Sequence, residues 1–253
     1  FMLNIFKQER RYTVFDKNTY VRLLKIIGTM TTYTLDAPTR RKIVDYYYDN
    51  ENRLLDQNEL LLRRRVFSSD AQLKIKRKYF NPDYFYTDNL RSHEREKDIG
   101  INDPLSKHYF FLNNALNSMF SNNLQFDPDK LFEQVRVNLT IKIDQENRKL
   151  FGYGGLKIEI RQEKLNIFNK LTNRKAKTEL LQFKLLSSED TLPLFEDFIT
   201  RVERHCKEIF YTKDSKHEIA IKNTRPLPTK EEIKKHKEEM LRRKAFEESG
   251  EPT

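Results

Sequence analysis

Hydrophobic side chains recur at every second position along several stretches of the chain. Residues 133–144, 152–165 and 179–186 alternate between polar and apolar, which is the spacing of a strand with one buried face. Residues 58–67 and 71–80 predict two more strands, joined by the turn Ser68-Ser69-Asp70. Shorter strands are expected at 6–15, 46–48 and 92–99. The pattern therefore predicts about eight strands, mostly antiparallel because of their hairpin-like spacing.

Helical spacing separates these groups of strands. Tyr20, Leu23, Leu24 and Ile27 share one face of a helix that begins near Asp16. Residues 103–120 and 188–211 predict two further helices, and a short helix or turn begins at 127–129. We therefore expect an α+β fold in which an antiparallel sheet has flanking helices. Closure of that sheet into a β-barrel would remove its exposed edges.

The composition changes after about residue 222. Residues 222–253 contain prolines and then a run of mixed charge, in which Thr229 and Glu232 can form a capping box. One interpretation is a solvated helix or a mobile tail, and the other is a helix that docks on a partner protein. The sequence thus predicts a domain over 1–221 and a charged helical tail over 222–253.

Composition and charge narrow the class of protein. The chain of 253 residues has a formal net charge of +10, and its aromatic content of 12% supports a hydrophobic core. A basic surplus favours anionic partners, such as phosphate chains, nucleotides, nucleic acid or an acidic membrane surface. Cys206 is the single cysteine, which excludes an intramolecular disulfide and a cysteine metal cluster. No apolar run approaches the ~20 residues that span a membrane, and a reducing location, most simply cytoplasmic, is expected.

Basic residues recur at alternate positions on the predicted strands. Arg63 and Arg65 share one face of a strand, and Lys74, Lys76 and Lys78 share one face of the next. For any single strand, a solvated outer face is a sufficient explanation. Like charges on neighbouring strands, however, destabilise a sheet unless an anion neutralises them. Taken together the strands favour a phosphate-rich ligand, because the planar guanidinium of arginine binds phosphate oxygens in a bidentate manner.

Glutamates are interspersed among these basic residues. Mg²⁺ and Mn²⁺ prefer oxygen ligands and bridge carboxylates to phosphates. Such an ion is therefore expected beside a bound phosphate chain. Its candidate ligands are Glu9, Glu94, Glu96, Glu159 and Glu163.

Several segments resemble, in the same order, the motifs of one superfamily. YYYDNENRLLDQNELLLRRRVF is similar to a Y-[FY]-D-[TN]-x-[ND]-x-x-L segment followed by an L-R-x-R strand, and QLKIKRKY to an F-x-E-I-K-R-K strand. FKQERRYTV, TELLQFKLL and Asp214-Ser215-Lys216 fall where the superfamily has a first strand, a late strand and a late Ser-Lys. Over roughly residues 7 to 216 the chain thus resembles the triphosphate tunnel metalloenzymes. These include the CYTH proteins and the polyphosphate polymerase domain of the vacuolar transporter chaperone family.

This resemblance implies a closed, eight-stranded antiparallel β-tunnel with a charged lumen. It implies that triphosphate, nucleotide or polyphosphate is bound and that Mg²⁺ or Mn²⁺ assists its hydrolysis, cyclisation or polymerisation. The expected catalytic cations are Arg63, Arg65 and Lys184. The expected phosphate-binding residues are Lys7, Arg11, Lys76, Lys78, Arg136 and Lys216, together with Lys157 and Arg161 on another strand that carries charges at alternate positions. Glu9 matches a carboxylate on the metal side of the site.

The chain departs from the superfamily at acidic positions. Lys7, Lys74 and Gln182 stand where CYTH members have glutamate, and Arg161 stands where an aspartate is common. Phosphoryl transfer depends on positioning and on charge neutralisation, so a site with fewer carboxylates can bind a polyanion and yet catalyse poorly. A triphosphatase or polyphosphate polymerase is therefore one interpretation, and a binding or accessory subunit is another. A basic nucleic-acid-binding module is a third, although its usual sequence signatures are missing.

Overall fold

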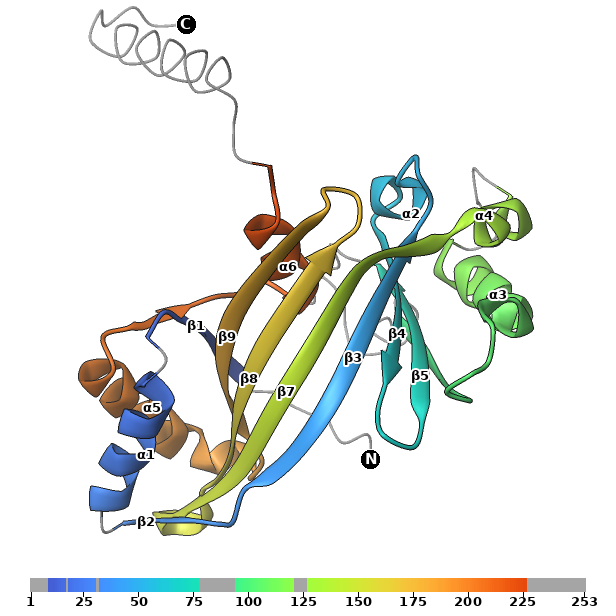
Figure 1. Ribbon diagram of the computed structural model, residues 1–253. Coiled ribbons are helices and arrows are strands. Elements are labelled where there is room, and N and C mark those ends of the chain that lie inside the picture. Colours follow the sequence, from blue (N-terminus) through green and yellow to red (C-terminus); the bar gives the residue numbers. More distant parts are fainter. Residues whose placement is uncertain (1–8, 17, 31, 78–93, 121–126, 227–253) are drawn as a thin grey trace, which may run out of the picture.

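The computed structural model describes residues 9–16, 18–30, 32–77, 94–120 and 127–226. Within them, ten strands form one antiparallel sheet with helices packed around it (Figure 1). The strands are β1 (Glu9–Val14), β2 (Tyr33–Leu35), β3 (Thr39–Asp49), β4 (Leu60–Val66), β5 (Ala71–Arg77), β6 (Glu94–Ile99), β7 (Arg136–Gly152), β8 (Lys157–Asn169), β9 (Arg174–Leu185) and β10 (Ile209–Tyr211). The helices are α1 (Thr19–Thr29), α2 (Leu54–Gln57), α3 (Tyr109–Phe120), α4 (Pro128–Gln134), α5 (Leu192–His205) and α6 (Lys216–Asn223).

The sheet is open in the part of the chain that the structure describes. From edge to edge its strands run β10, β1, β9, β8, β7, β3, β4, β5 and β6, and β2 pairs with β7 beside this path. The two edge strands do not pair with each other among the described residues. The α+β class with flanking helices is therefore confirmed. The expected closure into an eight-stranded barrel is wrong.

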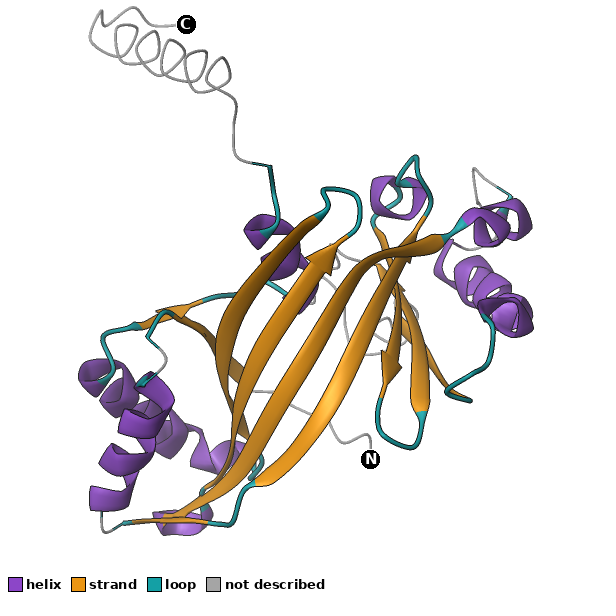
Figure 2. Ribbon diagram, viewed as in Figure 1, coloured by secondary structure: helices purple, strands orange, loops and turns teal. Residues whose placement is uncertain are grey.

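A helix explains how the sheet buries its inner face without closing. The sheet is strongly curved, and α6 lies on its concave side (Figure 2). Ile219 and Ala220 of α6 pack with Ile141, Ile143 and Leu165 of the central strands. Because these apolar side chains are buried against a helix, the opposite edges of the sheet do not have to meet to cover them.

Helices also cover two parts of the outer face of the sheet. Near the lower end in Figure 1, α1 and α5 enclose a core around Phe183 and Phe198, whose rings make an edge-to-face contact. Beside β4 and β5, α3 and α4 pack on Leu73 and Ile75. These two cores hold the ends of the curved sheet and leave its concave face to α6.

Three elements differ from the expectations of the sequence. The strand expected at 46–48 is the end of the 11-residue strand β3. The helix expected over 188–211 ends at His205, and β10 follows it and pairs with β1. Helix α6 was not foreseen, and the domain boundary expected after residue 221 falls inside it. Most of the expected tail lies outside the described residues, so that division stays a prediction.

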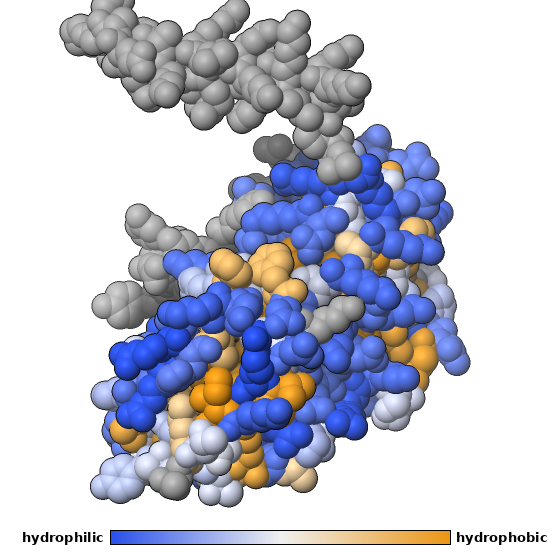
Figure 3. Space-filling model, turned by 60° about the vertical axis from the view of Figure 1, so that its left-hand side comes forward, coloured by the Kyte–Doolittle hydropathy of each residue, from blue (hydrophilic) through white to orange (hydrophobic). Residues whose placement is uncertain are grey.

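The surface is mainly hydrophilic in the view of Figure 3, with small apolar patches between polar side chains. The exposed large apolar residues of the described chain include Phe15, Phe210 and Tyr211. None of the helices in the described segments combines the length and the apolar character that a membrane crossing needs.

Candidate functional site

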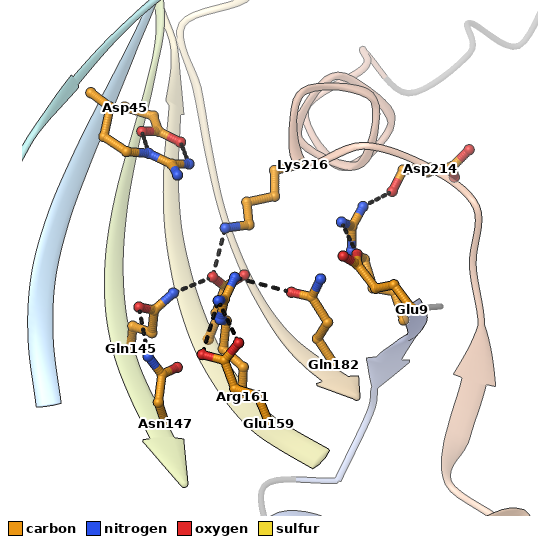
Figure 4. A network of polar contacts seen from close by, with 12 residues as sticks. Glu9, Asp45, Gln145, Asn147, Glu159, Arg161, Gln182, Asp214 and Lys216 are labelled. Atoms are coloured by element: carbon orange, nitrogen blue, oxygen red, sulfur yellow. Dashed lines mark hydrogen bonds and ion pairs between the residues drawn. The ribbon is translucent and has the colours of Figure 1, made fainter. Parts of the chain in front are cut away.

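The concave face changes character along the strands. In its upper half, as seen in Figure 1, apolar residues of β3, β7 and β8 pack against α6. In its lower half the same inward positions are polar, and most of the residues drawn in Figure 4 lie there; Asp45 lies higher, opposite Ile141. On β8 the change falls between Glu163 and Leu165, and on β7 between Ile143 and Gln145. We call this lower half the polar trough.

Glu163 lies at the centre of the polar trough and is 1% exposed. Its Oε1 accepts hydrogen bonds from Lys216 Nζ at 2.6 Å and from Gln145 Nε2 at 2.6 Å. Burial alone would raise the pKa of Glu163, but Lys216 and Arg161 outweigh that effect and hold it below its usual value. Burial lowers the pKa of Lys216, and the contact with Glu163 opposes that shift. The short contact between the two side chains favours the charged pair, so the charge of Glu163 is balanced by the protein itself.

The position of Lys216 follows from how α6 begins. Ser215 Oγ accepts a hydrogen bond from Glu218 N at 3.3 Å, and Ser215 N donates to Glu218 Oε2 at 2.6 Å. This capping box fixes the first turn of the helix. Lys216 is in that turn, and its side chain points down from α6 into the polar trough (Figure 4).

Two arginines of the face, Arg65 and Arg161, are paired with carboxylates. Arg65 Nε and Nη2 each donate to Asp45 at 2.7 Å. Arg161 Nη2 lies 3.1 Å from both carboxylate oxygens of Glu159, and its Nη1 donates to Gln182 Oε1 at 3.4 Å. These bonds hold the guanidinium planes in place before any ligand arrives.

Arg11 is held at the β1 side of the polar trough. Its Nη2 donates to Glu9 Oε1 at 2.8 Å, and its Nη1 donates to the carbonyl of Asp214 at 2.8 Å. Because Asp214 directly precedes the capping box, Arg11 also ties β1 to the start of α6.

The β5–β6 side of the face carries a further cluster. Lys74 contacts Glu94, and its Nζ lies 2.8 Å from Glu96 Oε2. Lys76 is half-buried, and burial lowers its pKa below the usual value. Arg63 lies beside the hydroxyl of Tyr47. The strand register places these side chains on the same face as Arg65.

Some cations of this face make no direct ion pair, although Glu94 lies opposite Lys76, and Glu9 and Glu159 lie opposite Lys184, in the strand register. Within the described segments, the half-buried side chains of Arg63, Lys76 and Lys184 make no ion pair. Several buried polar atoms also lack a hydrogen-bond partner there, among them Nε of Arg11, Arg63 and Arg161. Unsatisfied buried donors are costly, so these groups indicate a place for water or for an anionic ligand.

The carboxylates of the face do not gather into a metal site. In the part of the chain described here, no group of three or more Asp, Glu, His or Cys side chains is arranged to hold an ion. Glu9, Glu159 and Glu163 each contact an arginine or lysine instead. The donor set of the described residues therefore does not fit the divalent metal that the resemblance implies.

Most of the expected site residues occupy the concave face. The strand register or a direct contact places there Glu9, Arg11, Arg63, Arg65, Lys76, Glu94, Glu96, Lys157, Glu159, Arg161, Glu163, Lys184 and Lys216. Lys157 is exposed at the N-terminal end of β8. Arg136 is not part of the network, because it is exposed at the start of β7 and donates to the carbonyls of Glu133 and Val135. Lys7 and Lys78 lie outside the described residues.

Sequence reasoning missed Asp45, Gln145 and Asn147. All three are buried and face inward, and Asn147 Nδ2 donates to Gln145 Oε1 at 3.4 Å. A signal was present, since Gln145 and Asn147 continue the alternating positions of Ile141 and Ile143. A polar residue on an otherwise apolar strand face indicates a buried polar site.

No protein-family model matches the sequence, and no curated protein is similar to it. Among solved structures there are matches at low sequence identity. A putative adenylyl cyclase from Hippeastrum, described with a dominant triphosphatase activity, is 11% identical, with a TM-score of 0.46 over 87% of this chain and 97% of that one. Putative adenylate cyclases from Bacillus halodurans (12% identity, TM-score 0.44, 78% and 91% covered) and Vibrio parahaemolyticus (14%, 0.41, 85% and 97%) are also similar.

At such identities and TM-scores this likeness carries no argument about what the chain does. It does not say which residues of this chain act.

Proposed function

We propose that the polar trough, with the adjoining side chains of β4 and β5, binds the phosphate chain of a triphosphate or polyphosphate. One observation carries the proposal: cations from strands far apart in the sequence gather on one face, and Arg63, Lys76 and Lys184 form no direct ion pair in the described chain. Burying like charges in this way is unfavourable without a counter-charge. A chain of phosphates supplies several negative charges in a row.

The geometry suggests how such a chain is held. Arg65 and Arg161 are oriented by Asp45 and Glu159, so their remaining N–H groups can donate to phosphate oxygens with little loss of freedom. Lys76 and Lys184 act as point charges on either side. Lys216 closes the upper end of the polar trough from α6.

Titration calorimetry with tripolyphosphate, ATP, long-chain polyphosphate and a short RNA tests the proposal. We expect tripolyphosphate to bind, and Arg63→Gln to raise the Kd about tenfold to a hundredfold, because a hydrogen bond to a charged group contributes about 1.5–3 kcal/mol. Lys142→Gln is the matched control, since Lys142 is exposed on the other face of β7. Tight RNA binding without a response to phosphate chains would contradict the proposal and favour the nucleic-acid interpretation.

A second candidate function is hydrolysis of the bound chain. It is favoured by Glu163 Oε2, a buried carboxylate oxygen without a hydrogen-bond partner in the described chain. In this scheme the oxygen accepts a proton from water as the water attacks the terminal phosphorus. The bond to the bridging oxygen then breaks, and that oxygen leaves with the electron pair on the shortened chain.

Phosphate release from tripolyphosphate distinguishes hydrolysis from binding alone. An enzyme would release phosphate and lose that activity in Glu163→Gln, whereas binding without release would favour an accessory or sensing role. Metal dependence, polyphosphate synthesis and a cytoplasmic location stay predictions of the sequence. The first two are tested by adding Mg²⁺ or Mn²⁺ and by supplying ATP.

A further inference from the structure

Glu163 is almost completely buried in the polar trough, and the protein's own cations surround it. Lys216 Nζ lies 2.6 Å from its Oε1, and Arg161 and Arg65 interact with it electrostatically. A divalent ion at Glu163 would have to enter beside these fixed positive charges. Coulomb repulsion at short range in a poorly solvated site opposes that strongly.

Uncharged amides occupy the inward positions around Glu163. Gln145 faces it across the β7–β8 pair, and Gln182 and Asn147 lie opposite Arg161 on β9 and β7. A neutral amide oxygen attracts a divalent ion much less than a carboxylate does, and Gln145 already donates its amide hydrogen to Glu163 at 2.6 Å. The donors around this carboxylate therefore favour a lysine ammonium over a metal ion.

We infer that the concave face binds its phosphate chain directly, without a divalent metal, and that Lys216 supplies the positive charge at Glu163 where a metal would otherwise be needed. The inference rests on the proposed function, and it names the form of ligand that the site takes: the free phosphate chain rather than its metal complex. It follows from a donor set that consists of paired carboxylates and amides.

The inference has a direct consequence for solution behaviour. Mg²⁺ in solution binds tripolyphosphate through the same oxygens that the arginines and lysines need. A site that takes the free chain must therefore compete with Mg²⁺ for it. A site that takes the metal complex gains affinity when Mg²⁺ is added.

Calorimetric titration of the full chain with tripolyphosphate, in EDTA and then in excess Mg²⁺ at constant ionic strength, distinguishes these cases. We expect binding in EDTA and a higher apparent Kd in excess Mg²⁺, because Mg²⁺ removes the free chain. Binding that is unchanged or tighter in Mg²⁺, or that occurs only there, would overturn this inference and leave the proposed function standing. Absence of binding under both conditions would remove the proposed function and the inference with it.

A pair of lysine variants in the same helix tests the role of Lys216. Lys216→Met removes the ammonium from Glu163, and Lys222→Met removes one that contacts Asp214 at 2.6 Å on the surface. The loss of the free Mn²⁺ electron paramagnetic resonance signal reports metal binding to the protein without any phosphate. We expect wild type and Lys222→Met to leave the signal unchanged, and Lys216→Met to reduce it, because the cation nearest to Glu163 is removed while Arg161 and Arg65 remain. Equal signals from the two variants would contradict the role of Lys216.

A second variant keeps the test decisive if Lys216→Met does not fold, as judged by circular dichroism. Gln182→Glu places a carboxylate beside Arg161 and opposite Arg11 in the register of β9. This substitution should weaken tripolyphosphate binding in EDTA at least tenfold. Added Mn²⁺ should then restore part of the lost affinity. If wild type already removes the free Mn²⁺ signal at protein concentrations in the micromolar range, or if Gln182→Glu binds tripolyphosphate as well as wild type in EDTA, the inference is wrong.

Discussion

At the scale of single residues, the site depends on charges that are buried in pairs. Asp45 is fully buried, and its two oxygens accept from Arg65 at 2.7 Å. Removal of one member of a buried pair leaves the other without compensation. The stability of the fold and the geometry of the site are thus linked through the same side chains.

Asp45→Ala should lower the free energy of unfolding by about 3 kcal/mol, as is usual when a buried ion pair loses one partner. The control is Asp197→Ala, which removes a surface contact between Asp197 and Arg201 and should change stability by less than about 0.5 kcal/mol. Urea denaturation measures both values. Equal effects would mean that the Arg65–Asp45 pair contributes no more than a surface pair.

Glu163 should make stability depend on pH in the acid range. Its pKa in the folded chain is below the unfolded value of about 4.5, so the folded state favours the ionised form. This stabilisation is complete above the unfolded pKa and is lost as the pH falls through the folded value. Denaturation between pH 6 and pH 3 should show a steeper loss for wild type than for Glu163→Gln, and parallel curves would contradict this.

At the scale of elements, α6 determines where the polar trough ends. Its capping box fixes Ser215 against Glu218 and so positions Lys216. Ser215→Ala should lower the unfolding free energy by about 1 kcal/mol and should also raise the Kd for tripolyphosphate. Ser188→Ala is a suitable control, because the Ser188 side chain makes no capping hydrogen bond. Thermal unfolding measures the stability and calorimetry measures the Kd. A stability loss without any change in Kd would show that α6 does not contribute to ligand binding.

The sequence predicted those strands that the spacing of apolar residues is sufficient to identify. The hairpin of β4 and β5 and the alternation on β8 and β9 were expected within a few residues. The first half of β3 was not, because Thr39-Arg-Arg-Lys42 is polar on both faces and carries no period of two. Helix α6 is only two turns long and was missed, although Ser215 and Glu218 have the spacing of a capping box. Its packing on Ile141 and Leu165 is a tertiary contact that no local pattern reveals.

The inward and outward faces of the strands were also only partly predictable. On β8 the charged positions from Lys157 to Glu163 do face inward, as the ligand hypothesis requires. On β7 the charged position Lys142 faces outward, and the inward positions change from isoleucine to glutamine. Alternation shows that a strand has two different faces, but only the neighbouring strands determine which face is enclosed.

At the scale of the whole molecule, the open sheet should not be equally stable throughout. β8 is paired over its whole length with β7 and β9, whereas β10 and β6 are edges of the described sheet. Hydrogen exchange followed by mass spectrometry should therefore show the slowest exchange in β7 and β8 and the fastest in β6 and β10. Similar protection of the edge strands would indicate that they have partners beyond the described residues.

The internal pairing of charges has a consequence for which anions are preferred. An incoming anion can be neutralised by Arg63, Lys76 and Lys184 while Asp45, Glu159 and Glu163 keep their own partners. A longer or more highly charged phosphate chain must draw arginines away from those carboxylates. The carboxylates would then be unpaired and would repel the phosphates. Affinity should then pass through a maximum as the phosphate chain lengthens, so that the protein selects its ligand by matching charge.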